Sequence, residues 1–180
     1  MADINPTLAP ARPESQTDAS APRPDSLIDL IELLFFAYRD FVGDPDDILA
    51  PLGFGRAHHR VLHFVNRHPG MRVTDLLDIL RITKQSLGRV LRELVDEGFV
   101  DSRAGESDRR QRLLFPTPKG QALAGEFIAI QSRRISRALE ECGPGMREDA
   151  GRFLMAMIDP EDRAGVDRLI QHAERGRRPR

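Results

Sequence analysis

The chain has 180 residues, a net charge of −1, one cysteine and no tryptophan. The single cysteine excludes an intramolecular disulfide framework, and no apolar run approaches the about 20 residues that a membrane-spanning helix needs. Because the N-terminus also lacks the apolar stretch of a secretory signal, we expect a cytoplasmic protein with no membrane partner.

The first predicted elements are a tail and an apolar helix. Residues 1–24 carry five prolines among alanine, serine and threonine, a composition that cannot bury a core, so we expect disorder there. From Asp25 to Val42, apolar side chains cover more than half of a helix, which must therefore be buried by several neighbours, and a second subunit is an economical one. Residues 25–53 are thus predicted to form a dimerisation helix and loop, with helix breakers at Gly43, Pro45 and Pro51.

Two short helices joined by a turn come next. A helix is predicted over Gly55–Asn66, and Met71–Val73 is predicted to be a short edge strand. Thr74 is expected to cap the following helix, and Arg81-Ile82 to form the tight turn before a further helix that starts after Thr83. Two short helices around a tight turn constitute a helix-turn-helix unit.

The helix after Thr83 has one apolar face and one polar face. Its apolar residues recur with the i, i+3, i+4, i+7 spacing of a buried stripe, namely Leu87, Val90, Leu91 and Leu94. Its other side carries Lys84, Gln85, Gly88, Arg89 and Arg92. The Thr83 hydroxyl can cap the first turn, and Gly98 is expected to end the helix.

A hairpin is predicted directly after this helix. A strand begins near Phe99, the charged segment Ala104–Arg109 forms the turn, and a second strand returns through residues 113–115. A polar helix face beside a basic hairpin is the layout of a winged helix-turn-helix, with one element for the major groove and one for the minor groove of duplex DNA.

The distribution of charge agrees with that layout. Residues 54–120, the predicted winged helix-turn-helix, hold 13 basic and 8 acidic side chains and have a net charge of +5. Residues 1–53 have a net charge of −7, and residues 121–180 have one of +1. Basic charge concentrated on the predicted winged helix-turn-helix (the reader) is typical of a protein that binds DNA.

The C-terminal third is predicted to be helical. Pro118 suits the first position of a long helix that runs to about Cys142, and Gly143-Pro144-Gly145 breaks it. Two further helices are expected over residues 147–158 and 161–173, interrupted by Pro160, which makes residues 121–174 C-terminal dimerisation helices and residues 175–180 a basic tail. The predicted fold class is mainly α with a small β-wing: a winged helix-turn-helix flanked by N- and C-terminal dimerisation helices.

A short motif marks the hairpin and the start of the long helix. Asp108-Arg109-Arg110 is followed by Leu113 and Leu114, and then by Thr117-Pro118-Lys119-Gly120. With the stretch LGRVLRELVDEGFV at residues 87–100 and the order of the elements, this motif resembles the MarR (multiple antibiotic resistance regulator) family of transcription factors. The resemblance covers about residues 25–170. Pro116 departs from the family's usual leucine, and because proline cannot donate to a sheet it must lie at an edge or a strand end.

The resemblance implies a homodimer that regulates transcription from a pseudo-palindromic operator on double-stranded DNA. It implies that Arg110 enters the minor groove and that the Asp108 carboxylate holds its guanidinium. It also implies a small-molecule effector in a crevice between the dimer helices and the reader, for which Arg60, His59 and Tyr38 are weak candidates.

The predicted DNA contacts combine both elements of the reader. Glutamine can pair with adenine and arginine with guanine, which makes Gln85 and Arg89 candidates for reading bases. For Arg72, Arg103, Arg109 and Arg112, a phosphate contact and a solvated charge are equally compatible with the sequence. The complete set of predicted DNA-binding residues is Thr83, Lys84, Gln85, Ser86, Gly88, Arg89, Asp108, Arg109 and Arg110.

Other kinds of site find little support. His58, His59 and His63 lack a nearby cysteine or carboxylate at ligand spacing, so no metal is expected. Cys142 follows two glutamates that disfavour its thiolate, and no catalytic motif is present, so neither an enzyme nor a cofactor is predicted. Two other functions are compatible with the same fold: a winged-helix module that binds proteins, and a DNA-binding protein without an effector.

Overall fold

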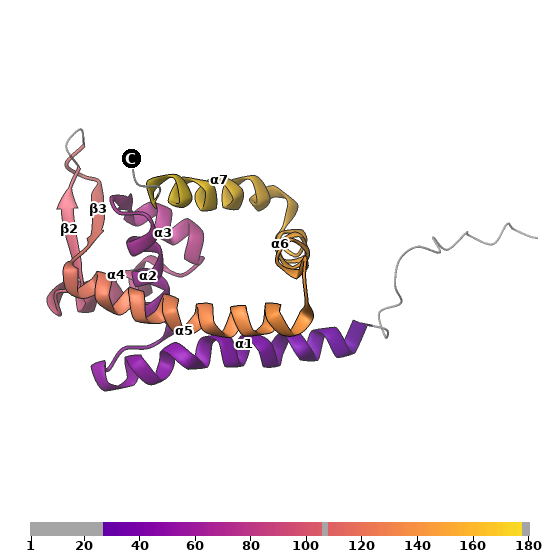
Figure 1. The fold of residues 1–180 in the computed structure, drawn as a ribbon. Coiled ribbons are helices and arrows are strands. Elements are labelled where there is room, and N and C mark those ends of the chain that lie inside the picture. Colours follow the sequence, from indigo (N-terminus) through magenta and orange to yellow (C-terminus); the bar gives the residue numbers. More distant parts are fainter. Residues whose placement is uncertain (1–26, 106–107, 178–180) are drawn as a thin grey trace, which may run out of the picture. The chain divides into compact units, whose positions relative to one another are not determined.

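The computed structural model describes residues 27–105 and 108–177 (Figure 1). The predicted tail at residues 1–24 and the last residues of the predicted basic tail lie outside this part of the chain. The elements, in chain order, are α1 (Ile28–Leu49), the 3-10 helix η2 (Ala50–Leu52), α2 (Arg56–Arg67), β1 (Met71–Arg72), α3 (Val73–Leu80), α4 (Lys84–Asp96), β2 (Val100–Ala104), β3 (Arg112–Pro116), α5 (Pro118–Cys142), α6 (Met146–Ala156) and α7 (Pro160–Arg177). The predicted fold class, mainly α with a small β-wing, is confirmed.

The strands form one antiparallel sheet in the order β1-β3-β2. Met71 of β1 pairs with Leu114, and β2 pairs with β3 from Val100↔Pro116 to Ala104↔Arg112. The hairpin of β2, β3 and their connection, residues 100–116, is called the wing below. Pro116 is the last residue of β3, as its missing N–H requires.

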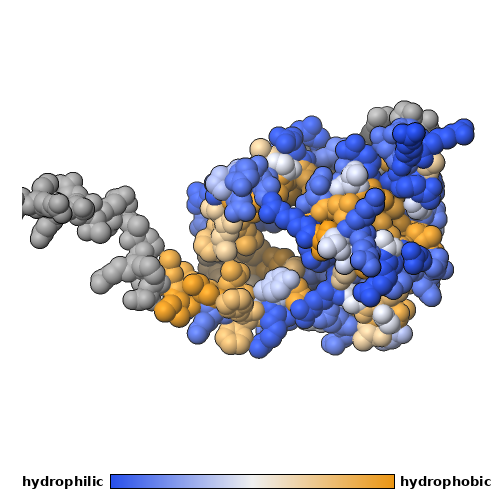
Figure 2. Space-filling view, turned by 180° about the vertical axis from the view of Figure 1, so that it is seen from behind, coloured by the Kyte–Doolittle hydropathy of each residue, from blue (hydrophilic) through white to orange (hydrophobic). Residues whose placement is uncertain are grey.

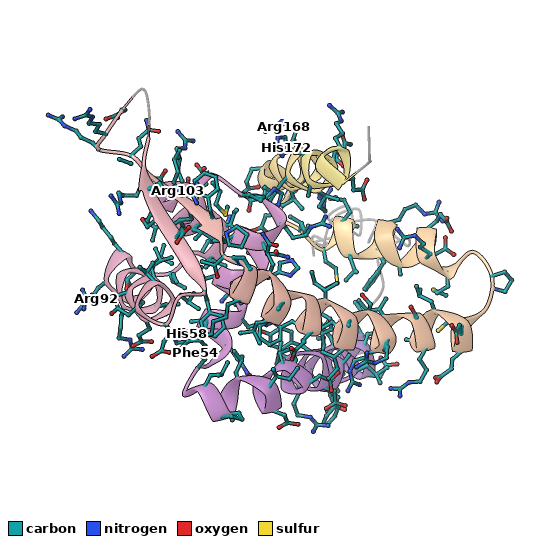
Figure 3. All side chains as sticks on the ribbon, turned by 60° about the vertical axis from the view of Figure 1, so that its left-hand side comes forward. Phe54, His58, Arg92, Arg103, Arg168 and His172 are labelled. Atoms are coloured by element: carbon teal, nitrogen blue, oxygen red, sulfur yellow. The ribbon has the colours of Figure 1, made fainter. Side chains whose placement is uncertain are left out.

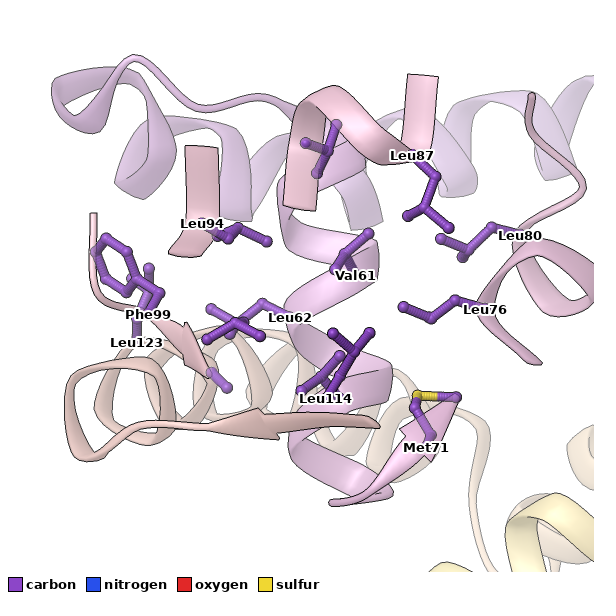
Figure 4. Close-up of a cluster of buried hydrophobic side chains, with 14 of the residues drawn as sticks. Val61, Leu62, Met71, Leu76, Leu80, Leu87, Leu94, Phe99, Leu114 and Leu123 are labelled. Carbon is purple, nitrogen blue, oxygen red and sulfur yellow. The ribbon is translucent and has the colours of Figure 1, made fainter. Parts of the chain in front are cut away.

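The core is built around α2. Val61, Leu62 and Val65 are at most 1% exposed. Figure 4 shows Val61 and Leu62 surrounded by side chains from α3, α4, β1, β3 and α5. Each fully buried aliphatic side chain contributes about 1.5–3 kcal/mol, so this cluster holds the helix-turn-helix and the wing as one body.

The first helix is longer than predicted, because α1 continues through Pro45 to Leu49. A proline inside a helix leaves the carbonyl four residues earlier without its N–H donor. That carbonyl belongs to Phe41, and the side-chain amide of Gln131 in α5 donates to it at 3.5 Å. Arg134, one turn further along α5, holds the Asp44 carboxylate through two contacts of 2.7 Å. Contacts from α5 therefore replace what Pro45 removes.

One further local prediction was wrong. Thr74 does not cap α3: Arg72 occupies the cap position, and its N–H donates to the Asp75 carboxylate at 3.0 Å. The expected break between the last two helices is present, since α6 ends at Ala156, and Pro160 is the first residue of α7, where its missing N–H would be unpaired anyway. This helix extends to Arg177, so the predicted basic tail is helical over its described part.

The Thr117-Pro118-Lys119 segment locks the start of α5 against the end of α4. The Thr117 hydroxyl donates to the Gly98 carbonyl at 2.7 Å. The Lys119 ammonium donates to the Glu97 carbonyl at 2.8 Å and lies 4.0 Å from the centre of the Phe99 ring. A cation at the last carbonyls of a helix is favourable, so this segment stabilises α4 from outside.

The chain divides into two units, one ending at Ala37 and the other beginning at Tyr38. In the described part of the first unit, large apolar side chains of α1 are exposed, and Figure 2 shows them gathered at the beginning of this helix. They are Ile28, Leu30, Ile31, Leu33, Leu34, Phe35 and Phe36. The second unit separately exposes Ile135, Phe153, Leu154 and Met157. Apolar side chains in such numbers are typical of a contact surface.

Candidate nucleic-acid interface

The outer face of α4 carries all of the helix residues predicted to contact DNA. Leu87, Val90 and Leu94 are buried, as the spacing predicted. The opposite face is exposed, and Figure 3 shows Arg92 extending outward from it. The exposed residues are Thr83, Lys84, Gln85, Ser86, Gly88, Arg89 and Arg92. A side-chain carbon placed on Gly88 would meet no atom within 4 Å, so the backbone there is open to a ligand.

The start of α4 is capped as predicted. Thr83 Oγ1 accepts the backbone N–H of Ser86 at 3.1 Å and donates to the Ser86 hydroxyl at 2.9 Å. The turn before it reverses at Arg81, which has a φ of 49° and whose guanidinium pairs with the Asp162 carboxylate of α7. These contacts set the direction in which the N-terminal turn of α4 points.

We expect Thr83→Ala to lower the free energy of unfolding by about 1 kcal/mol, because the Ser86 N–H loses its acceptor. Urea unfolding followed by circular dichroism measures this loss. Thr74→Ala is the matched control, since Thr74 is exposed and does not cap α3. Equal effects of the two substitutions would contradict the capping role of Thr83.

The wing tip differs from the prediction in one contact. Asp108 does not hold the guanidinium of Arg110; its Oδ1 accepts the backbone N–H of Arg110 at 2.9 Å. The Asp108 carbonyl in turn accepts the N–H of Gln111 at 3.0 Å. A short carboxylate reaches the amide two residues ahead more readily than a distant guanidinium, and this contact shapes the turn. The side chains of Arg109 and Arg110 are exposed and have no partner among the described residues.

Other arginines of the reader are held by neighbouring residues of the chain. Arg103 pairs with Asp101 at 2.9 Å, and its guanidinium lies 4.6 Å from the centre of the Phe115 ring (Figure 3). Arg112 donates to the hydroxyl and the carbonyl of Ser102 at 3.1 and 3.0 Å. These contacts stiffen the wing, and among its described residues the arginines without a partner are those at the tip, Arg109 and Arg110. Arg72 is likewise engaged, by Asp75.

The three histidines of α2 differ in their contacts, although the rings of His59 and His63 lie edge to face with centroids 6.3 Å apart. Among the described residues, no group of three histidine, cysteine or acidic side chains could hold a metal ion. His59 is 8% exposed, packs at 4.8 Å against the Phe127 ring, and its Nε2 has no hydrogen-bond partner in the part of the chain that the structure describes. His58 contacts Glu93 of α4 at 2.6 Å, a pair that periodicity does not reveal because 35 residues separate its members.

The three effector candidates have different environments in the single chain. Arg60 donates to the Leu80 carbonyl at 3.2 Å, His59 is buried, and Tyr38 is exposed. None of the three lines the cavity of about 470 Å³ between the Asn66–Met71 segment and α7, or the one of about 640 Å³ beside α6.

The burial of His59 predicts a pH dependence of stability. Desolvation lowers the pKa of His59, an effect that a hydrogen bond with Gln131 and the charge of Asp46 partly oppose. The unfolded chain, with a histidine pKa of about 6.5, therefore binds a proton that the folded chain refuses. Stability is complete above this pH and declines as the pH falls from it towards the lowered pKa.

We expect urea midpoints to fall between pH 7.5 and pH 5, and to fall less steeply for His59→Gln. The pKa of His68 is lowered in the same direction, mainly by its burial, so part of the decline persists in this variant. Parallel declines for the parent and the variant would contradict the role of His59.

Comparisons with known proteins identify the family to which this chain belongs. The model of the MarR family matches residues 52–111. The HTH-type transcriptional regulator PetP of Rhodobacter capsulatus is 46% identical to the chain over 151 residues, which cover 79% of this chain and 91% of PetP. The chain belongs to the MarR family. The resemblance in the wing and in α4 is thereby confirmed.

Two more distant similarities agree. The MarR-family chain is 31% identical to the HTH-type transcriptional repressor Mb2911 of Mycobacterium bovis over 101 residues, 56% of this chain and 73% of that protein. Its fold is similar to that of Streptococcus pneumoniae FabT in complex with DNA, with a TM-score of 0.64 at 14% identity, over 72% of this chain and 93% of FabT.

As a MarR-family protein, the chain is a DNA-binding transcription regulator and not an enzyme. In the described residues, no helix is both long enough and apolar enough to cross a membrane.

Proposed function

We propose that the protein is a sequence-specific repressor that acts as a homodimer on a pseudo-palindromic operator. The observation that carries this proposal is the exposed face of α4 together with a wing tip where Arg109 and Arg110 are exposed and have no partner within residues 27–105 and 108–177. In this proposal α4 enters the major groove, and Arg110 enters the flanking minor groove, where a narrow A·T-rich segment concentrates negative potential. Repression is supported by the similarity to Mb2911, which is named a repressor.

The DNA-binding residues we propose are those predicted from the sequence. Gln85 and Arg89 are exposed on α4 and have the donor groups that read adenine and guanine. Thr83, Lys84 and Ser86 surround the N-terminus of α4, where backbone N–H groups favour a phosphate. Asp108 acts indirectly, through the shape of the wing turn.

Binding to DNA is tested by fluorescence anisotropy with the duplex upstream of the protein's own gene and a scrambled duplex, each at several salt concentrations. We expect the upstream duplex to bind at least about a thousandfold more tightly, and both affinities to fall steeply as salt rises. Equally weak binding to both duplexes, together with no sequence enriched from a random pool, would favour a winged-helix module that binds proteins.

The proposed homodimer is supported by the exposed apolar side chains of α1. Phe35 is 69% exposed, so Phe35→Asp leaves the core intact but places a carboxylate in any apolar interface that forms there. Burying an unpaired charge costs several kcal/mol, so we expect the parent to sediment as a dimer and the variant as a monomer. Analytical ultracentrifugation distinguishes them, and a parent that is monomeric at micromolar concentration would contradict the homodimer.

A small-molecule effector completes the proposal. It would have to bind more tightly to one spacing of the two readers than to another, because only a difference in affinity shifts the population.

A further inference from the structure

His58, at the start of α2, is a buried imidazole whose orientation is determined on three sides. Its ring stacks on that of Phe54 with centroids 4.4 Å apart and planes 4° apart (Figure 3). The backbone N–H of Gly55 donates to its Nδ1 at 3.1 Å. Because Nδ1 accepts this hydrogen bond, the ring proton lies on Nε2, which faces α4.

The group that accepts the hydrogen bond from Nε2–H is the carboxylate of Glu93, which belongs to α4. His58 Nε2 lies 2.6 Å from Glu93 Oε2. The other carboxylate oxygen, Oε1, lies 4.0 Å from Nε of Arg89, one turn earlier in α4. The exposed fraction rises along this chain of contacts, from 9% for the His58 side chain to 44% for Glu93 and 76% for Arg89. A half-exposed carboxylate that contacts a buried histidine therefore lies beside a guanidinium at the surface.

This anchoring changes what Glu93 does near DNA. A free glutamate on a helix that docks to DNA would be repelled by phosphates, and its rotatable side chain would give no fixed field. The short bond to a buried ring removes this freedom and holds the negative charge beside Arg89. At 4.0 Å this charge attracts the Arg89 guanidinium. A guanidinium without such a neighbour has many phosphates within reach and only one base position that it can read.

We propose that His58 and Glu93 are positioning residues that hold Arg89 for contact with a base edge instead of with phosphate, so that Glu93 contributes to sequence discrimination. This inference rests on the proposed docking of α4 in the major groove. It assigns a function to two side chains that need not touch DNA themselves.

The test measures specificity, which a purely structural role of Glu93 would not alter. The probes are a duplex that the parent protein enriches from a random-sequence pool and a scrambled duplex, titrated by anisotropy at several salt concentrations. Glu93→Gln keeps the length of the side chain and an acceptor for His58 Nε2–H, but removes the charge from beside Arg89. We expect the ratio of the two affinities to fall about tenfold. On the scrambled duplex, the slope of log affinity against log salt should steepen by about 0.9, the value for one added phosphate contact.

Two controls make the result specific. Glu97→Gln is the same substitution at the position after α4, where the exposed side chain does not contact His58, and it should leave the affinity ratio unchanged. In an Arg89→Ala background, Glu93→Gln should have no further effect on the ratio, because the proposed action passes through Arg89.

The outcomes separate this inference from the proposed function. A parent that enriches no sequence overturns the proposed function and this inference with it. A parent that discriminates, combined with a folded Glu93→Gln variant that discriminates equally well, overturns this inference alone. A loss of discrimination that persists at full size in the Arg89→Ala background also overturns it.

Discussion

Arg110→Ala should weaken binding to the operator by about 1–3 kcal/mol, the largest loss expected from any single side chain of the wing. The guanidinium is exposed at the wing tip and has no partner among the described residues, so within this part of the chain no contact competes with DNA for it. The loss should be largest for operators with A·T-rich flanks, where the minor groove is narrow. Anisotropy titrations with A·T-rich and G·C-rich flanks measure both effects.

The control for charge is Arg147→Ala, which removes an exposed arginine from α6, outside the winged helix. Equal losses for Arg147→Ala and Arg110→Ala would show a general electrostatic effect and contradict the wing contact.

Asp108 provides a second comparison at the wing tip. Its carboxylate accepts a backbone N–H, and an asparagine side chain can do the same, so Asp108→Asn should keep most of the affinity while Asp108→Ala loses more. Equal losses for Asn and Ala would indicate that the negative charge itself matters, as a pair with the Arg110 guanidinium would require.

Gly120→Ala should lower the free energy of unfolding by about 3 kcal/mol or more. A side-chain carbon at Gly120 would lie 2.0 Å from the Phe99 carbonyl oxygen, and backbone cannot move aside as a flexible side chain can. Relief requires α5 to move away from the end of α4, which disrupts the contacts of Thr117 and Lys119 as well. Urea unfolding measures the loss of stability. If the variant does not fold, we expect it to be found in inclusion bodies instead.

Gly125→Ala is the matched control, because it is the same substitution in the same helix. No atom lies within 4 Å of a side-chain carbon placed there. Alanine has the higher helix propensity, so this variant should be more stable than the parent by about 0.5–1 kcal/mol. If both variants lost stability equally, the close approach of Gly120 to Phe99 would not be the cause.

Much of the winged helix-turn-helix could be predicted from the sequence because the residues that determine it lie close together in the chain. The spacing of Leu87, Val90 and Leu94 distinguishes the two faces of α4 within a few turns, and Thr83 caps a helix that starts at the next residue. The position of Pro118 at the start of α5 is equally local. The family resemblance rests on the wing motif, the stretch at residues 87–100 and the order of the elements, and the match to PetP confirms it.

Several contacts that the sequence does not reveal depend on a partner that is distant in the chain, whereas the errors at Thr74 and Asp108 concern local hydrogen bonds. Pro45 reads as a helix breaker until Gln131, far along the chain, supplies the missing donor. The pair of His58 and Glu93 depends on how α2 packs against α4. Gly120 is required because the backbone of Phe99, between α4 and β2, passes directly over the start of α5.

Most helices, the buried face of α4 and the family resemblance could be predicted from the sequence, because periodicity, caps and short motifs act within a turn or two. The continuation of α1 through Pro45 and the contact of Glu93 with a buried histidine depend instead on packing between distant elements. Each of these depends on the position of one atom relative to another, which only the folded chain defines.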